Sequence, residues 1–185
     1  MIRNTKSLIE FLMKNYVENV DLALDMTAGN GNDSKNIIEI LKAKKLLAFD
    51  IQEEAKKASI DLLKRADIDL DRVKFILDGH ENVYKYLDEG VDFAIYNLGY
   101  LPKSDHMITT SYDKVLESLK HLLGFLNKKG IIVITFYPGH DSGMKESLEI
   151  PKFLQELDQR QFTIVKFDFI NQKNKPPFSI MIQKN

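Results

Sequence analysis

The stretch LDMTAGNGNDS, residues 24–34, ends an apolar run and begins a segment with helical spacing. Its two glycines, Gly29 and Gly31, allow the backbone to turn tightly and to come close to a ligand. Asp33 or Ser34 can then cap the helix that follows. A loop that binds the phosphates of a dinucleotide has a third glycine at the position where this chain has Ser34. The stretch therefore predicts a strand, a tight turn and a helix, and a bare turn without a ligand is the alternative.

The same alternation of apolar runs and helical patterns continues along the chain without a repeat or a linker-like stretch. The expected strands read VDLALDM, KLLAFD, RVKFILD, VDFAIYN, GIIVITFY, FTIVKFDFI and FSIMIQK. The expected helices cover residues 33–43, 53–65, 80–87, 112–126 and 144–157, after an N-terminal helix within 1–18 that packs on the sheet. This order predicts an α/β fold in which helices cover both faces of a mostly parallel sheet.

The C-terminal end departs from the alternation, because its last two strands are separated by the loop NQKNKPPF and no helix. Two strands joined by a short loop pair as a hairpin, so we expect the last of seven strands to run antiparallel to its neighbour. Pro151 interrupts the preceding helical pattern. We expect either a kink or the start of a new helix at this residue.

The composition is that of one globular domain, residues 1–185, with 44% hydrophobic and 29% charged residues. The 26 basic and 27 acidic residues nearly cancel, so a nucleic acid can be bound only through a local positive patch. The absence of cysteine excludes disulfides, thiolate metal sites and thiol nucleophiles. The first 20 residues contain no apolar run of the length that a signal peptide or a membrane span needs. We therefore expect a cytoplasmic protein with no membrane partner.

Three of the expected parallel strands end in an aspartate: Asp25, Asp50 and Asp78. The carboxyl ends of such strands share one edge of the sheet, where ligands bind. Asp50 follows Gly29 by 21 residues, the spacing of an acid that binds the two hydroxyls of a ribose, although it could instead cap the next helix. Asp78 can accept a hydrogen bond from an adenine amino group. Three neighbouring carboxylates require a cationic or donor-rich ligand, and S-adenosylmethionine meets this requirement better than NAD or ATP, whose phosphates they would repel.

Six short motifs occur in order along nearly the whole chain. They are D-x-T-x-G-N-G-N-D at 25–33, AFDIQ at 48–52, LDGHEN at 77–82, NLGYLP at 97–102, GH at 139–140 and NQ-x-N-x-PPF at 171–178. This set resembles the rRNA methylase family, whose studied bacterial members methylate the wobble uridine of transfer RNA. The departures are small: Met26 stands where alanine is commoner, and Ser34 stands where threonine is usual and keeps the hydroxyl.

The resemblance implies a Rossmann-like class I methyltransferase fold, S-adenosylmethionine as the methyl donor and the anticodon loop of tRNA as the substrate. It further implies that 5-aminomethyl-2-thiouridine at position 34 is converted to 5-methylaminomethyl-2-thiouridine. The residues expected to bind the donor lie at the first four strand ends. They are Asp25, Thr27, Gly29, Asn30, Gly31, Asn32, Asp33, Asp50, Ile51, Gln52, Asp78, Gly79, His80 and Asn97.

The stretch NLGYLP is expected to hold the acceptor, because it follows the fourth strand. The side-chain oxygen of Asn97 and a nearby backbone carbonyl can accept hydrogen bonds from the attacking amine, and Tyr100 can stack on a flipped-out base. His140 is the expected acid, base or substrate anchor, and the three residues form the expected catalytic set. A tight turn with a packed tyrosine is the alternative. The expected substrate contacts are Leu98, Gly99, Tyr100, His106, Asn171, Gln172 and Asn174.

The loop NQKNKPPF carries Lys173 and Lys175. With Lys103, Lys145 and Arg160 these lysines can contact the phosphates of an RNA, and a solvated loop is the alternative. The histidines show no metal-ligand spacing, so we expect no metal.

Other functions remain open from the sequence. Within methyltransferases they are methylation of an rRNA base or of a small-molecule amine. Outside that class they are an NAD-dependent oxidoreductase, which Asp25 and Ser34 disfavour, and a noncatalytic module that binds RNA or adenosine. The apolar face of the segment KVLESLKHLLGFL could form a homodimer, or it could cover the sheet.

Overall fold

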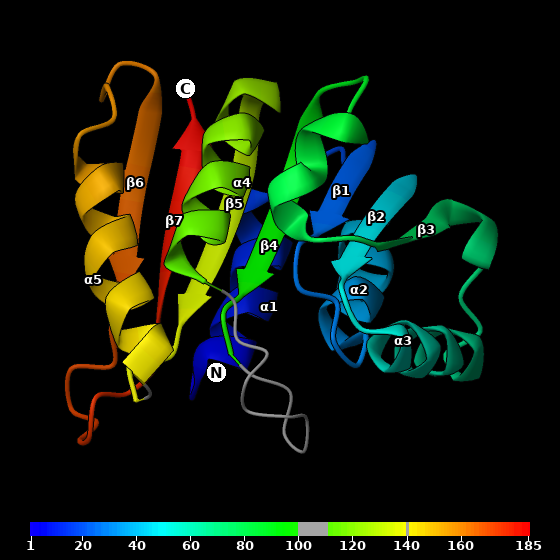
Figure 1. Cartoon of the computed structure of the whole chain (residues 1–185), viewed down its shortest axis with the longest axis horizontal. Coiled ribbons are helices and arrows are strands. Elements are labelled where there is room, and N and C mark those ends of the chain that lie inside the picture. Colours follow the sequence, from blue (N-terminus) through cyan, green and yellow to red (C-terminus); the bar gives the residue numbers. More distant parts are fainter. Residues whose placement is uncertain (100–110, 140) are drawn as a thin grey trace.

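The apolar runs form one seven-stranded sheet, shown in Figure 1 for the computed structural model, which describes residues 1–99, 111–139 and 141–185. The strands are β1 (Leu22–Asp25), β2 (Lys45–Asp50), β3 (Val73–Leu77), β4 (Val91–Asn97), β5 (Leu126–Phe136), β6 (Phe162–Phe167) and β7 (Phe178–Lys184). Their order is β3-β2-β1-β4-β5-β7-β6. Strands β1 to β5 are parallel, and β7 pairs antiparallel with both β5 and β6. The predicted class, strand number and antiparallel last strand are confirmed.

Helices cover both faces of this sheet, as the alternating pattern predicts (Figure 1). The helical segments are α1 (Thr5–Tyr16), α2 (Asn32–Asn36), η1 (Ile37–Leu41), α3 (Glu53–Arg65), η2 (Leu70–Arg72), η3 (His80–Lys85), α4 (Tyr112–Phe125) and α5 (Asp141–Gln155). One apolar cluster joins α1, η1 and α3 to one face, and a second joins η3, α4 and α5 to the other. Because β4 and residues 130–136 of β5 are covered on both faces, these stretches are almost continuously apolar.

The apolar face of α4 is part of the core. Val115, Leu119 and Leu122 are fully buried in the cluster that includes Ile132 and Ile134 of β5. The helix therefore covers the sheet. The alternative, that this face is exposed, is wrong, and a homodimer stays a prediction.

Two helical segments differ from their expected form. The helix expected over 33–43 is divided, because α2 ends at Asn36 and a π-helical segment follows to Leu41. The segment after β3 is a 3₁₀-helix, His80–Lys85. In α5, the helix continues through Pro151, so no new helix begins there.

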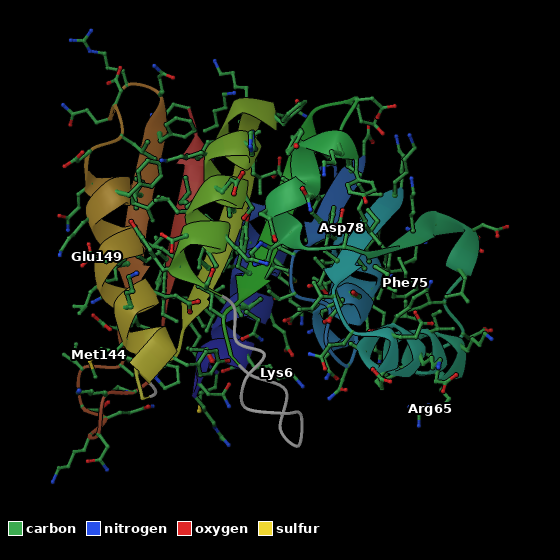
Figure 2. All side chains as sticks on the ribbon, viewed as in Figure 1. Lys6, Arg65, Phe75, Asp78, Met144 and Glu149 are labelled. Atoms are coloured by element: carbon green, nitrogen blue, oxygen red, sulfur yellow. The ribbon has the colours of Figure 1, made fainter. Side chains whose placement is uncertain are left out.

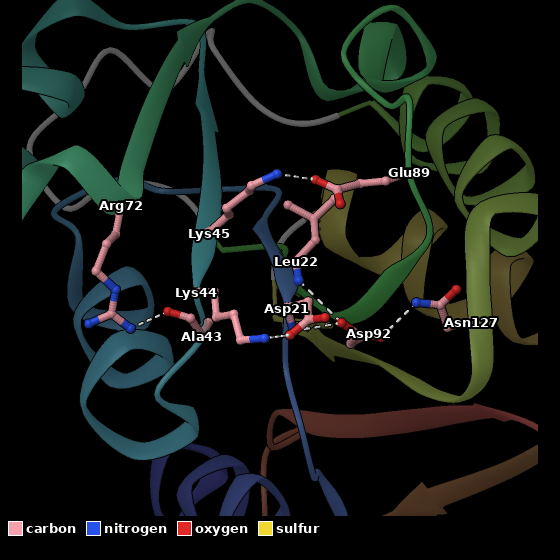
Figure 3. Close-up of polar contacts among 9 residues, drawn as sticks. All are labelled: Asp21, Leu22, Ala43, Lys44, Lys45, Arg72, Glu89, Asp92 and Asn127. Atoms are coloured by element: carbon pink, nitrogen blue, oxygen red, sulfur yellow. Dashed lines mark hydrogen bonds and ion pairs between the residues drawn. The ribbon is translucent and has the colours of Figure 1, made fainter.

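Polar contacts join the strands at the amino edge of the sheet, the edge where β1 to β5 begin (Figure 3). The Oδ2 atom of Asp92 accepts hydrogen bonds from the backbone N–H groups of Asp21 (2.8 Å) and Leu22 (3.2 Å). The Asn127 side chain donates to Oδ1 of the same aspartate at 2.6 Å. Neighbouring contacts in Figure 3 are the ion pairs Lys44–Asp21 and Lys45–Glu89 and the hydrogen bond from Arg72 to the Ala43 carbonyl. These polar groups at the amino edge therefore satisfy one another.

Within the described ranges, no helix has the length and apolar character needed to cross a bilayer.

Candidate functional site

The ends of β1, β2, β3 and β4 meet at one edge of the sheet, which we call the carboxyl edge (Figure 1). The parallel pairing of these strands brings Asp25, Asp50, Asp78 and Asn97 to this edge. Figure 2 marks Asp78 here and also Lys6 of α1, a residue that the sequence patterns did not connect with the site. The candidate site is therefore built from loops that follow four neighbouring strands.

The turn after β1 requires its two glycines. Gly29 and Gly31 have φ values of 49° and 81°, which L-residues with a side chain rarely adopt. A Cβ atom on Gly31 would lie 2.8 Å from the Cα atom of Ser59 in α3, so a side chain has no room there. The Ser59 hydroxyl donates to the Gly29 carbonyl at 2.8 Å. The turn is thus held closely against α3.

Asp50 links this turn to the end of β2. Its Oδ2 atom accepts from the Gly29 N–H and its Oδ1 atom from the Gln52 N–H, both at 2.9 Å. Gln52 is the N-cap residue of α3, so the alternative that Asp50 caps this helix is wrong. Each carboxylate oxygen can accept a second hydrogen bond. The half-buried carboxylate can therefore receive two hydroxyls of a ligand, as a ribose presents them.

Asp78 is an ionised acceptor at the end of β3. Its Oδ1 atom accepts from Asn82 and from the Gly79 N–H, and its Oδ2 atom accepts from the Tyr86 hydroxyl, all at 2.8 Å. Burial alone would raise the pKa of Asp78, but these hydrogen bonds lower it below its usual value. The carboxylate is held in a fixed orientation, and its Oδ2 atom keeps one lone pair for an amino group of a ligand.

Two large apolar side chains lie beside these acids. Ile51 follows β2 and is 54% exposed, while Leu77 ends β3 and is 48% exposed. Apolar surface at a strand end is suited to contact with a flat base. Ile51 is an expected site residue; Leu77 is not, although its position directly before Asp78 is a signal that could have identified it.

Asp25 lies beneath the turn and does not face outward. Its side chain is fully buried, and its oxygens accept from the Thr27 N–H (3.2 Å) and the Ser34 hydroxyl (2.7 Å). Burial and, to a smaller extent, the negative charge of Asp33 together raise the pKa of Asp25 to about 7. Asp25 therefore supports the turn from inside the protein, and its expected contact with a ligand stays a prediction.

Asn97 is fixed by contacts with the turn after β1. Its N–H donates to the Thr27 hydroxyl at 2.8 Å, and its side-chain Nδ2 atom donates to Asp33 at 3.2 Å. Burial raises the pKa of Asp33, and the Asn97 hydrogen bond and the charge of Lys6 oppose this change. Because the amide nitrogen is used by Asp33, the amide oxygen of Asn97 is the atom that can accept from a ligand.

Tyr137 is a site residue that the sequence analysis missed. Its half-buried side chain follows β5, and its ring covers Gly99, whose added Cβ atom would lie 3.4 Å from the ring. Burial raises the pKa of its hydroxyl, and hydrogen bonding to Thr5 and Asn97 partly offsets this effect. Thr5 begins α1, so the N-terminal helix reaches the carboxyl edge. Only the fold brings Thr5 and Tyr137 together, and no local pattern indicates it.

His80 belongs to the core beside the site. It is 7% exposed, and its ring packs against Tyr96 in an edge-to-face arrangement at 5.9 Å between centroids. Burial lowers the pKa of His80 to about 4, although Glu81 acts in the opposite direction. The ring is therefore neutral near pH 7, and its expected contact with a ligand stays a prediction.

The other expected site residues are divided between loop surfaces and buried positions. Asn30, Asn32 and Gly99 are exposed, Thr27, Asp33 and Gln52 are half-buried, and Leu98 and Gly79 are buried. Tyr100, Lys103, His106 and His140 lie outside the described residues.

The β6–β7 loop, residues 168–177, lies at the carboxyl edge because β6 runs parallel to β5 and β7 returns from it (Figure 1). Asn171, Gln172 and Asn174 are all exposed in this loop. Arg160 precedes β6 and lies at the opposite edge. The expectation that Arg160 belongs to the same basic patch as this loop is wrong, because the length of β6 separates them.

In the described part of the chain, no group of three or more His, Asp or Glu residues is arranged to hold a metal ion.

Known proteins are similar to this chain in both sequence and fold. The family model described as “Putative rRNA methylase” matches residues 46–183. A chloroplast protein of Arabidopsis thaliana, named tRNA (mnm(5)s(2)U34)-methyltransferase, is 27% identical over 178 residues, or 91% of this chain. The chain spans 65% of the length of that curated relative.

Solved structures agree with this similarity. A “putative rRNA-methylase” from Clostridium thermocellum has a TM-score of 0.93 at 35% identity, over 100% of both chains. A “putative methyltransferase” from Streptococcus mutans, crystallised in complex with SAH, has a TM-score of 0.89 at 36% identity, also over 100% of both chains. The N-methyltransferase NodS from Bradyrhizobium japonicum shares the fold, with a TM-score of 0.72 at 11% identity over 97% of this chain and 94% of that one.

Proposed function

This chain belongs to the “Putative rRNA methylase” family, and from that premise we propose that it is an S-adenosylmethionine-dependent methyltransferase that methylates the amine of 5-aminomethyl-2-thiouridine at the tRNA wobble position. The observation that carries the proposal is the pair of fixed carboxylates, Asp50 and Asp78, at adjacent strand ends beside a glycine turn. The Streptococcus mutans relative binds SAH, the product of methyl donation, which supports the assignment of the donor.

The residues of the donor pocket fit S-adenosylmethionine. Asp50 can accept from the two ribose hydroxyls, and Asp78 from the adenine amino group, while Ile51 and Leu77 offer apolar surface to the adenine ring. A phosphate-bearing dinucleotide fits poorly, because Ser34 replaces the third glycine and its hydroxyl is used by buried Asp25. The donor supplies a methyl group on a positively charged sulfur, which is strongly electrophilic.

Asn97 is the acceptor-side residue that the structure orients most clearly. Its amide oxygen can accept a hydrogen bond from the attacking amine and so direct the nitrogen lone pair toward the methyl group. An alkylamine needs no strong base, because it loses its proton far more readily than a ring amide does. The protein's task at this position is therefore orientation.

The RNA substrate is supported by the name of the Arabidopsis relative and by the lysines of the β6–β7 loop. Lys173 and Lys175 are exposed at the carboxyl edge, so a phosphate backbone can approach them while a base enters the site. The overall charge of −1 requires such a local contact.

The proposal is tested by incubating the purified protein with S-adenosylmethionine and tRNA that carries the unmethylated aminomethyl nucleoside. Mass spectrometry of the digested tRNA should show 5-methylaminomethyl-2-thiouridine. Ribosomal RNA and tRNA without the aminomethyl group serve as parallel substrates. Methylation of ribosomal RNA alone would overturn the tRNA assignment, and stabilisation by NAD without stabilisation by S-adenosylmethionine in a thermal-shift experiment would overturn the donor.

Asn97→Ala tests the role of the oriented amide. The turnover number should fall about a hundredfold, because the amine is no longer aimed at the methyl group. Binding of S-adenosylmethionine, measured by calorimetry, should change little. Asn127→Ala is the matched control, since Asn127 lies at the amino edge and contacts Asp92; unchanged turnover in Asn97→Ala removes Asn97 from the catalytic set.

A further inference from the structure

Glu146 is a buried carboxyl group that the reaction scheme above does not use. Its side chain is only 2% exposed, and its Oε1 atom has no hydrogen-bond partner among the described residues. It lies on the inner stripe of α5, where the other members are Gly143, Ile150 and Leu154. Packing alone favours an apolar residue at such a position, because an unpaired buried acid destabilises the fold.

The beginning of α5 lies against the end of β5. A Cβ atom on Gly143 would be 2.2 Å from the carbonyl oxygen of Tyr137, so only glycine permits this approach. Glu146 follows Gly143 by about one helical turn on the same face. Figure 2 marks Met144 where α5 begins, near the carboxyl edge, and Glu149 farther along the helix. Glu146 therefore lies one helical turn away from the residue of α5 that touches Tyr137, below the edge of the sheet where β4 and β5 end.

The first turns of α4 and α5 also lie together. The Lys145 Nζ atom is 4.9 Å from the centroid of the Tyr112 ring, and Tyr112 is the first residue of α4. The carboxyl of Glu146 thus belongs to the region where β4 and β5 end and α4 and α5 begin. In the sheet, β4 and β5 follow β1 on the side away from β2 and β3, so this region lies beside the strand ends that carry Asp50 and Asp78.

A structural ion pair does not explain this acid. On the same helix Glu149 pairs with Lys152 at 2.8 Å, near the surface, whereas Lys145 contacts an aromatic ring. Burial raises the pKa of Glu146 to about 8. A buried carboxyl group with a raised pKa and no hydrogen-bond partner in the described part of the chain is a candidate to bind a ligand.

We propose that Glu146 binds the amine that accepts the methyl group, so that the acceptor side of the site is selective for primary alkylamines carried on a nucleobase. This inference rests on the proposed function. An alkylammonium group has three N–H donors and one positive charge. Asn97 offers one neutral acceptor. The raised pKa of Glu146 leaves its carboxyl protonated near pH 7 in the free protein, and it releases this proton to solvent when the ammonium group binds. The resulting carboxylate is a second acceptor of opposite charge, and it takes one proton from the nitrogen so that the lone pair is free to attack. A nucleobase with an uncharged substituent cannot replace the amine at this carboxyl.

The test compares two anticodon stem-loop RNAs that differ only in the aminomethyl group of the 2-thiouridine, bound in the presence of SAH. The wild-type protein should prefer the aminomethyl RNA. Glu146→Met should reduce that preference about tenfold or more, as expected for the loss of a charge-assisted hydrogen bond. Its affinity for SAH should stay the same, and its thermal midpoint should stay the same or rise, because an unpaired buried acid has been removed.

Two further variants make the result decisive. Glu146→Gln keeps the shape of the side chain and should also lose most of the preference, which covers the case in which Glu146→Met does not fold. Glu149→Gln, an outer acid on the same helix, should retain it. If Glu146→Met or Glu146→Gln keeps the full preference for the aminomethyl RNA, this inference is overturned. The proposed function still stands in that case if the wild-type protein transfers the methyl group. A wild-type protein with neither preference nor methyl transfer overturns the proposed function as well.

Discussion

At the residue scale, the most informative group is Asp50, because its one carboxylate connects the loops that follow β1 and β2. It holds the N–H groups of Gly29 and Gln52 and keeps two lone pairs free. This arrangement fixes the distance between the ends of β1 and β2. The same carboxylate oxygens that order these loops are the ones that we propose to accept hydrogen bonds from the ribose.

Asp50→Ala should weaken S-adenosylmethionine binding about a hundredfold, because two hydrogen bonds to a charged acceptor are lost. Calorimetry measures this change directly. Glu53→Ala, which removes an exposed acid three residues later, is the control and should leave the affinity unchanged. Equal affinities in the two variants would exclude Asp50 from the donor pocket.

Asp25 should make the protein less stable as the pH rises. Its folded pKa is about 7 and its ordinary value is 3.8, so the unfolded chain releases a proton that the folded chain keeps in this range. The stabilising effect is complete below pH 3.8, and it is lost as the pH rises toward and through 7. Urea unfolding of Asp25→Asn should show a smaller decrease between pH 4.5 and 8 than the wild type. Asp61→Asn, an exposed acid on α3, should behave as the wild type; the same result for Asp25→Asn would contradict the assignment.

The sequence predicts well which polar residues lie at the carboxyl edge, where the position follows directly from a strand end. Asp50, Asp78 and Asn97 each close an apolar run, and all three lie at the carboxyl edge. The orientation of Asp25 could not be predicted, because a strand end does not show on which side of a turn a side chain lies. Glu146 could have been noticed, since it interrupts an apolar helical stripe.

At the element scale, α3 covers residues 53–65 as its periodicity predicts. Its buried positions have helical spacing, and its first turn is acidic, which favours a helix start at the same residue. The π-helical segment η1 was not predicted. A π-helical turn has hydrogen bonds between residues five apart, whereas an α-helix has them between residues four apart. Over a single turn, the spacing of apolar residues is nearly the same for both. The role of α1 at the site was also missed, because its apolar face indicates only that it covers the sheet.

Gly31 offers a test of the turn that precedes α2. Gly31→Ala should destabilise the protein by about 3 kcal/mol, because alanine combines a left-handed backbone with an overpacked contact at Ser59. Urea unfolding measures the loss. Gly124→Ala is a matched control within α4, where an added Cβ atom has no neighbour within 4 Å. That variant should gain about 0.5–1 kcal/mol from the helix propensity of alanine. Equal effects of the two substitutions would show that the turn is not constrained.

At the scale of the whole molecule, the two edges of the sheet have different roles. The amino edge is closed by internal polar contacts around Asp92. The carboxyl edge carries the glycine turn, the candidate site acids Asp50 and Asp78, and the loop lysines Lys173 and Lys175. The sheet class follows from the alternation of strands and helices, and this determines at which edge each loop lies. That is why Lys173 and Arg160, close in sequence, are on opposite edges.

The joint substitution of Lys173 and Lys175 by glutamine should weaken tRNA binding and reduce its salt dependence by about one unit of slope for each lysine that contacts a phosphate. Filter binding at several salt concentrations measures both effects. Arg160→Gln should change neither, because it lies beyond the other end of β6. An equal loss in both proteins would indicate a nonspecific effect of charge.

The reversed direction of β7 has a consequence for how this architecture can diversify. Its register is fixed by pairing with β5 on one side and β6 on the other, so it does not depend on the length of the loop between β6 and β7. Residues 168–177 can therefore be lengthened, shortened or exchanged without moving any strand. The contact that we propose between this loop and RNA can therefore change in evolution, or be engineered, while the ends of β1, β2 and β3 stay constant.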